Sequence, residues 1–257
     1  MPTITRDGVK LAYEERGGGS PTFVLVHGWT CDRSFFAPQA EHFSKRHRVV
    51  SVDLRGHGES DKPQGAYDIA TYADDLASLI GELELGKVVA VGHSMGGITV
   101  LQLGAAYPDR VAAIVMVDPA PLAFPPELRA GIEGLVAAIE NGNREPQRQF
   151  IEGNLFLPTS DKSLVKRVAD TMCAAPGHVA VAAMKGILAF DGVAAAARCT
   201  VPALHLAATP PLNPPHLMSQ WMPKVVNGWT VGAGHFNQLE AATQVNAMIE
   251  GFLRHHA

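Results

Sequence analysis

The sequence predicts an α/β fold with a mostly parallel central sheet, helices on both faces and a helical cap insertion. Three observations lead to this prediction. Short runs of β-branched and aromatic residues alternate with longer stretches of helical periodicity. These short runs are continuously apolar, which is typical of parallel strands buried on both faces. Residues 119–191 contain no strand-like run and are predicted to form a block of helices.

Composition supports one large folded domain. The chain has 257 residues, of which 47% are hydrophobic and 18% are charged, so it contains enough apolar surface for a core. Its formal net charge is −4, and its basic residues form no stripe along the sequence. We therefore expect no nucleic-acid partner.

Strands and helices alternate through the first half of the chain. The run at 22–26 is β-branched and aromatic, and the run at 48–54 leads into a polar, glycine-rich loop at 55–60. In chain order we predict strand 9–14, strand 22–26, helix 34–43, strand 48–54, helix 69–83, strand 87–91, helix 96–107 and strand 111–117.

The alternation stops after residue 118. Four prolines between 119 and 126 mark the start of a helical segment, which we interpret as a cap over a site. We expect a core domain of residues 1–118 and 192–257, and a cap of residues 119–191. The remaining predicted elements are helices 127–140, 147–154, 161–174 and 179–190, strands 201–207 and 228–231, and a closing helix 238–253.

Residues 92–96 read GHSMG and fit the pattern G-x-S-x-G. The pattern lies between a predicted strand and a predicted helix, where a sharp turn exposes the serine hydroxyl and glycines are needed beside it. The N-terminus of the following helix also favours nearby negative charge. These features predict that Ser94 is a nucleophile.

The chain resembles the α/β-hydrolase fold family in four motifs that occur in the family's order. They are HGW at 27–29, DLRGHGES at 53–60, GHSMGG at 92–97 and GAGHF at 232–236. The resemblance implies an enzyme that cleaves ester-like bonds, and it covers most of the chain outside the cap.

A serine hydroxyl needs a base that takes its proton. Among eleven histidines, His235 follows the last predicted strand in a glycine-rich loop, and the resemblance places the catalytic histidine there. His93 neighbours Ser94, but adjacent residues of a tight turn point in different directions. The tetrahedral intermediate also needs hydrogen-bond donors. The backbone N–H of Met95 supplies one, and the resemblance suggests Trp29 for the second.

The sequence position of the acid that would orient His235 differs from the position that is common in the family. Many family members carry it in the loop that corresponds to 208–215, which contains no Asp or Glu here. Asn213 in that loop can orient a histidine but cannot offset its charge. Asp118 ends the predicted strand 111–117, a place where some members carry their acid, although an aspartate before a proline is also a common turn residue. We predict Asp118 as the acid.

We expect a small-molecule substrate with an ester-like carbonyl and an apolar acyl chain or ring. Carboxylic esters and lactones, including acyl-homoserine lactones, fit this expectation. No cofactor is implied, and no histidine–carboxylate spacing resembles a metal site. The candidate pocket residues are Trp29, Leu122, Phe124, Phe150, Phe156, Leu157 and Met184.

Two other functions are compatible with the sequence. The family includes cofactor-free dioxygenases that cleave quinolone rings, some with an acid at the position of Asp118. It also includes non-catalytic receptors of small ligands that retain the three residues. Haloalkane dehalogenase and epoxide hydrolase are disfavoured, because Ser94 occupies the position where those enzymes use an aspartate.

The N-terminal residues MPTITRDGVK contain no apolar signal-peptide core, and no apolar run approaches the length of a membrane span. We therefore expect no membrane association and a cytoplasmic location. The three cysteines are far apart and are expected to be reduced thiols. A homodimer is compatible with the sequence, which does not fix an oligomeric state.

Overall fold

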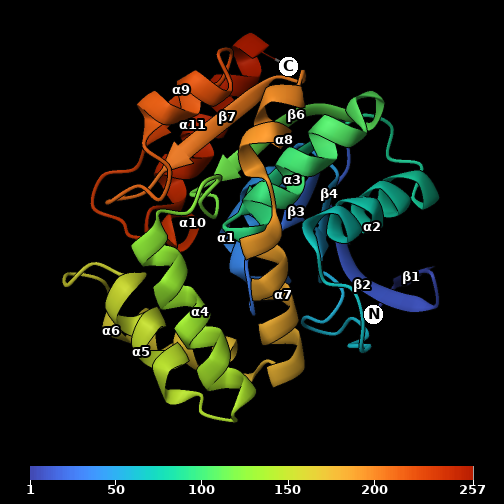
Figure 1. Ribbon diagram of the computed structural model, residues 1–257. Helices are drawn as coiled ribbons and strands as arrows, with labels where there is room; N and C mark the ends of the chain where they lie inside the picture. Colours follow the sequence, from blue (N-terminus) through green and yellow to red (C-terminus); the bar gives the residue numbers. More distant parts are fainter. Residues whose placement is uncertain (257) are drawn as a thin grey trace.

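A twisted sheet forms the centre of the protein in a computed structural model that describes residues 1–256 (Figure 1). Among these residues the sheet has eight strands in the order β1-β2-β4-β3-β5-β6-β7-β8. The bounds are β1 (Thr3–Arg6), β2 (Val9–Arg16), β3 (Thr22–Val26), β4 (Val49–Val52), β5 (Val88–His93), β6 (Val111–Val117), β7 (Ala203–Ala207) and β8 (Val226–Trp229).

The predicted mostly parallel sheet is confirmed. β1 and β2 pair antiparallel, β2 pairs antiparallel with β4, and the other neighbours pair parallel. All residues of β3 and β5 are buried, in agreement with their continuous apolar runs. Parallel strands bring their carboxyl ends to one edge of the sheet, so the residues after β5, β6 and β8 gather there.

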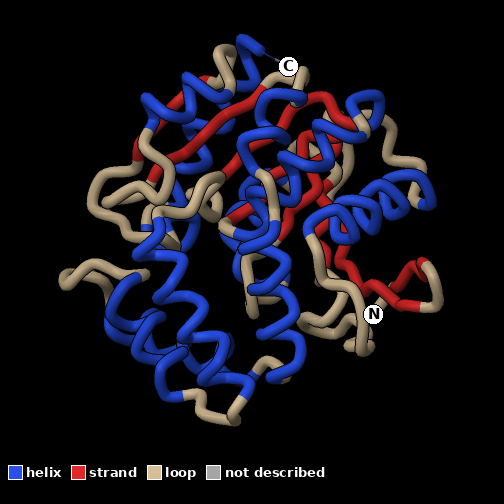
Figure 2. The backbone as a smooth tube through the Cα atoms, viewed as in Figure 1, coloured by secondary structure: helices blue, strands red, loops and turns tan. Residues whose placement is uncertain are grey.

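Helices cover both faces of the sheet (Figures 1 and 2). On one face, α1 (Ala37–Phe43) and α11 (Ala242–His256) share an apolar cluster with inward residues of the sheet. On the other face, α2 (Ile69–Glu82) and α3 (Met95–Ala106) pack beside each other. The shorter elements are η1 (Arg33–Phe36), η2 (Pro108–Arg110), α8 (Gly192–Arg198), α9 (Pro215–Trp221) and α10 (Asn237–Glu240).

Four helices lie together beyond the carboxyl edge of the sheet, within the segment that we propose as the cap (Figure 1). They are α4 (Pro126–Glu140), α5 (Glu145–Asn154), α6 (Lys162–Ala174) and α7 (Gly177–Ala189). In the described part of the chain no single helix has the length and apolar composition to cross a membrane. Only α6 and α7 taken together reach those criteria, and the two are bent by 99°.

The structure differs from the predicted elements in four places. β1 was not anticipated: Asp7 and Gly8 both have positive φ (51° and 76°), the geometry of a tight hairpin turn that pairs β1 with β2. The helix predicted at 34–43 begins as η1, and the closing helix is divided into α10 and α11 at Ala241. The proline-rich loop leads into an additional helix, α9, whose first residue is Pro215.

Candidate active site

Ser94 lies at the sharp turn between β5 and α3. Its φ of 54° and ψ of −116° place a non-glycine residue in a sparsely populated backbone region. Two hydrogen bonds hold this conformation: Ser94 N–H donates to Val117 O over 3.1 Å, and Ala120 N–H donates to Ser94 O over 3.0 Å. The backbone of the loop after β6 therefore fixes the serine.

The glycines of the motif are required by close backbone approach. A Cβ atom on Gly92 would lie within 3.0 Å of the Gly96 carbonyl oxygen, and one on Gly96 would lie within 3.0 Å of the Val26 carbonyl oxygen. Neither position tolerates a side chain, because the neighbouring atoms belong to the backbone. The motif predicted from the sequence thus has a steric basis in the fold.

Asp118 and His235 form a buried pair at the same edge. The Nδ1–H group of His235 donates to Asp118 Oδ2 over 2.7 Å, and Asp118 is completely buried. Asp118 Oδ1 accepts a second hydrogen bond from Ala208 N–H over 3.1 Å. With Nδ1 carrying the proton, Nε2 of the neutral imidazole is left as a hydrogen-bond acceptor. The structure brings together the acid and base predicted from the sequence.

Asn213, the other group considered for orienting the histidine, has different partners. Its Oδ1 accepts from Leu122 N–H over 2.8 Å. Its Nδ2 donates to Pro119 O over 2.8 Å and to Ala120 O over 3.2 Å. Asn213 therefore holds the backbone that leads from Asp118 toward α4 and makes no hydrogen bond to His235 among the described residues.

His93 supports the backbone of His235. Its ring is buried, and Nε2–H donates to the His235 carbonyl oxygen over 2.9 Å. Burial, and secondarily the neighbouring His235 ring, hold the pKa of His93 well below 6.5, so His93 is neutral at neutral pH. His93 thus supports the loop that carries His235.

His27 and His57 stabilise loops near the site. His27 donates from Nδ1 to Gly28 O over 2.8 Å and accepts from Leu54 N–H at Nε2 over 3.1 Å. His57 donates from Nδ1 to Arg55 O over 2.9 Å. Burial lowers the pKa of His57 to about 3, with a smaller contribution from His27.

The two backbone amides considered as oxyanion donors flank Ser94. Met95 begins α3, where helix N–H groups have no partner within the helix. Trp29 follows Gly28, whose added Cβ would lie 3.1 Å from Ser94 Cβ, so this loop lies directly against the serine. Neither amide N–H donates to any residue between 1 and 256. Two backbone donors are thus available beside the hydroxyl.

The Trp29 side chain links the site to the cap. Its indole is buried, and Nε1–H donates to the Ala180 carbonyl oxygen of α7 over 2.8 Å. The loop after β3 is therefore tied to the cap as well as to Ser94.

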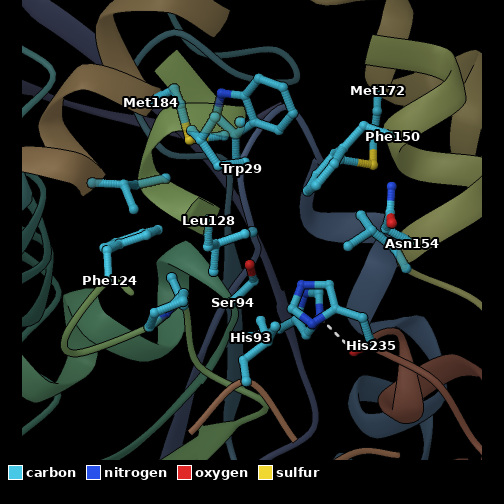
Figure 3. A pocket seen from close by; sticks show the side chains of 18 of the residues that line it. Trp29, His93, Ser94, Phe124, Leu128, Phe150, Asn154, Met172, Met184 and His235 are labelled. Carbon is cyan, nitrogen blue, oxygen red and sulfur yellow. Dashed lines mark hydrogen bonds between the residues drawn. The ribbon is translucent and has the colours of Figure 1, made fainter. Parts of the chain in front are cut away.

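A cavity of about 370 Å³ opens above Ser94 and His235. Figure 3 shows Ser94 and His235 at its base, Phe124 and Leu128 on one wall, and Phe150 and Met172 on the opposite wall. Among the described residues that line it, one, Glu127, is an Asp or Glu, and none is a Lys or Arg. In the described residues no group of three or more His, Cys, Asp or Glu side chains is arranged to hold a metal ion.

The candidate pocket residues divide into two groups. Trp29, Phe124, Phe150 and Met184 line the cavity, whereas Leu122, Phe156 and Leu157 do not. Leu122 packs against Gly192, and Phe156 stacks on Phe236 with ring centroids 5.1 Å apart. Leu128, Gly131 and Ile132 also line the cavity and were not predicted, although their helical spacing after Phe124 was a usable signal. The other unpredicted lining residues include Glu127, Asn154, Met172, Ile187 and Leu212.

Known proteins that are similar to this chain share its fold. The family model of the alpha/beta hydrolase fold matches residues 21–166. A 2-(acetamidomethylene)succinate hydrolase of Mesorhizobium japonicum is 40% identical over 137 residues, which cover 53% of this chain and 47% of that protein. The chain spans about half the length of this curated relative. It covers 35% of another relative, an uncharacterized protein of Mycobacterium bovis.

Solved structures match over nearly the whole chain. A thermophilic esterase from Thermogutta terrifontis has a TM-score of 0.88 and 26% identity, covering 99% of this chain and 97% of its own. Est816, described as an N-acyl homoserine lactone degrading enzyme, has a TM-score of 0.84 and 27% identity, covering 98% and 100%. The strand order of the sheet and the position of Ser94 at a sharp strand-to-helix turn agree with the match to the family model. The proteins similar to this chain include hydrolases and an esterase. The chain therefore belongs to the α/β-hydrolase fold family.

Proposed function

We propose that the protein is a serine hydrolase that cleaves a carboxylic ester or lactone. The observation that carries this proposal is the buried Asp118–His235 hydrogen bond of 2.7 Å beside a serine in a strained strand-to-helix turn. A carboxylate in this position holds the imidazole in the tautomer that accepts a proton at Nε2 and stabilises the imidazolium that results.

The reaction proceeds in two halves. Ser94 Oγ attacks the carbonyl carbon while its proton moves to His235 Nε2, and the carbonyl oxygen accepts hydrogen bonds from Met95 N–H and Trp29 N–H. The bond to the leaving alcohol then breaks, and His235 returns its proton to that oxygen. Water attacks the acyl-enzyme in the same way, and the serine is regenerated as the acid product leaves.

The cavity indicates the substrate class. Its walls are mainly aliphatic, aromatic and thioether side chains, including Phe124, Leu128 and Met172 (Figure 3). Such a lining favours an acyl chain or ring without charge, because a buried charge needs a partner. The similarity to an esterase and to an enzyme that degrades N-acyl homoserine lactones supports esters and lactones as the first compounds to test.

Hydrolysis of p-nitrophenyl esters from acetyl to decanoyl, by the wild type and Ser94→Ala side by side, tests the proposal. We expect turnover in the wild type that the variant lacks, with a chain-length profile set by the cavity. Equal rates in the two proteins would overturn it. Oxygen uptake on quinolone rings would then indicate a dioxygenase, and stoichiometric ligand binding without turnover would indicate a receptor.

A further inference from the structure

Three backbone groups of Gly234 and His235 anchor the loop that carries His235. Gly234 N–H donates to Glu240 Oε2 over 2.9 Å. His235 N–H donates to Leu155 O over 3.0 Å, and His235 O accepts from His93 over 2.9 Å. The bond from the ring to Asp118 fixes the imidazole itself, so the loop and the side chain are held separately.

Two of these anchors lead into the cap. Leu155 follows α5 directly, within the proposed cap segment. Glu240 uses its second carboxylate oxygen, Oε1, to accept from the Ser160 hydroxyl. Ser160 Oγ in turn accepts from Leu157 N–H over 3.0 Å. Glu240 therefore bridges Gly234 N–H, beside the histidine, and the Ser160 hydroxyl of the cap segment. The Ser160 hydroxyl is in turn fixed because it also accepts from Leu157 N–H.

The histidine loop and the cap segment 155–160 are in direct contact. A Cβ on Gly234 would lie 2.9 Å from the Leu155 carbonyl oxygen and 3.1 Å from Phe156 Cα. Phe156 stacks on Phe236, with ring centroids 5.1 Å apart. Glu240 is half-buried here, and a carboxylate that accepts from neutral donors makes stronger hydrogen bonds than an uncharged acceptor does.

We propose that Glu240 is a positioning residue for His235, and that Glu240 and Ser160 together latch the histidine loop to the cap. This inference rests on the proposed function of Ser94 and His235. This latch, made of the hydrogen bonds of Glu240 to Gly234 and Ser160, fixes the backbone one residue before His235. Its loss therefore allows the imidazole of His235 to shift relative to the Ser94 hydroxyl. A misplacement of about 1 Å at a reacting group lowers the rate by as much as about 100-fold.

Removal of the latch should lower kcat more than it raises KM, because the cavity walls stay in place. For Glu240→Ala we expect kcat to fall about 10- to 100-fold, with KM changed by less than about 3-fold. Ser160→Ala breaks only the cap side of the latch and should lower kcat by less. Glu240→Gln keeps the shape and one carbonyl acceptor for Gly234 N–H, so it should restore part of the activity lost in Glu240→Ala.

The experiment measures kcat and KM on p-nitrophenyl butanoate, the rate at which a fluorophosphonate labels Ser94, and the melting temperature. Labelling depends on activation of the serine and should fall in parallel with kcat. Glu250→Ala is the matched control: this carboxylate on α11 also accepts from two donors, the side chains of His42 and Arg46, and neither donor belongs to the histidine loop. We expect the control to lose stability while keeping kcat and labelling rate.

Wild-type kcat and labelling in Glu240→Ala, with turnover that still depends on Ser94, would overturn this inference and leave the proposed function standing. An equal loss of kcat in Glu250→Ala would also overturn it, because the effect would then be one of general stability. Turnover that does not depend on Ser94 would overturn the proposed function instead. If Glu240→Ala does not accumulate as folded protein, Ser160→Ala and Glu240→Gln decide the same question.

Discussion

At the scale of single residues, the candidate site combines two unusual backbone conformations. Ser94 has a φ of 54° and Asp118 a φ of 36°, and the two residues are joined because Ser94 N–H donates to the carbonyl oxygen of Val117, which precedes Asp118. Conformations of this kind persist only where the surrounding structure enforces them, and they gather at functional sites. Here the strain lies at the proposed nucleophile and at the proposed acid.

Asp118→Asn tests the acid. Asparagine has the same shape and tolerates positive φ, so the variant should fold. It should nevertheless lower kcat by about 10³- to 10⁴-fold, because the neutral amide neither enforces the reactive tautomer nor stabilises the imidazolium. Steady-state kinetics on an ester cleaved by the wild type, with circular dichroism as the folding control, gives the answer. A folded variant with nearly wild-type kcat would exclude Asp118 as the acid.

Two glycine substitutions compare a position where a Cβ would meet backbone atoms with a position where it would meet open space. Gly96→Ala should destabilise the protein by about 3 kcal/mol or more, because its Cβ meets the backbone of Val26 and His27. Gly134→Ala should stabilise it by about 0.5–1 kcal/mol, because Gly134 is an exposed residue inside α4 with open space around it. Urea unfolding of both variants measures these changes. Similar effects in the two variants would contradict the steric interpretation of the serine motif.

At the scale of elements, α4 forms one wall of the cavity, with Leu128 projecting into it (Figure 3). The helix presents residues at helical spacing toward the site, so a single substitution on this face changes the space available to the acyl chain. Pro126 is the first residue of the helix, and Leu122, four residues earlier, donates its N–H to Asn213 Oδ1. The position of α4 thus connects the loop after Asp118 to substrate size.

Leu128→Trp should shorten the preferred acyl chain, because the larger ring fills part of a cavity of about 370 Å³. For octanoyl and decanoyl esters we expect kcat/KM to fall by about 10-fold or more, since overpacking or lost apolar contact costs about 1–3 kcal/mol. Acetyl ester turnover should change little. Leu164→Trp, at a half-buried leucine of α6 that does not line the cavity, is the control. An unchanged chain-length profile would mean that long chains bind elsewhere.

At the scale of the whole molecule, buried neutral histidines link stability to pH. Burial holds the pKa of His27, His93 and His205 below 6.5, and it lowers the pKa of His57 to about 3. In the unfolded chain these rings bind protons as the pH falls below about 6.5, whereas in the folded protein they bind protons only at a lower pH. The stability that they contribute is therefore complete above pH 6.5 and is lost progressively as the pH falls.

We expect the free energy of unfolding to decrease between pH 7 and pH 4.5, with a slope of up to about 1.4 kcal/mol per pH unit for each such histidine. His57→Gln removes one of them and should give a shallower slope, although it is less stable at pH 7. Urea titrations at several pH values measure both slopes. Identical slopes for the wild type and the variant would show that His57 does not contribute to this pH dependence.

The sequence by itself determined the features that depend on local sterics and periodicity. Continuous apolar runs predicted the parallel strands, because burial on both faces leaves no polar side to alternate. The glycines around Ser94 predicted a tight turn, which the structure explains by backbone atoms that leave no room for a Cβ. The loop position of His235 followed from the order of the motifs. The catalytic roles of these residues remain predictions for the experiments above.

Only the tertiary structure decided which distant groups meet. The sequence allowed either Asp118 or Asn213 to orient His235. In the fold the Asp118 carboxylate accepts a hydrogen bond from His235, whereas the Asn213 side chain accepts one from the backbone of Leu122. It also separated Phe124, which lines the cavity, from Phe156, which stacks on Phe236. The bridge from Glu240 to Ser160 had no signal in the sequence. Such contacts join segments far apart in the chain, and their partners are set by how the elements pack rather than by local residue pattern.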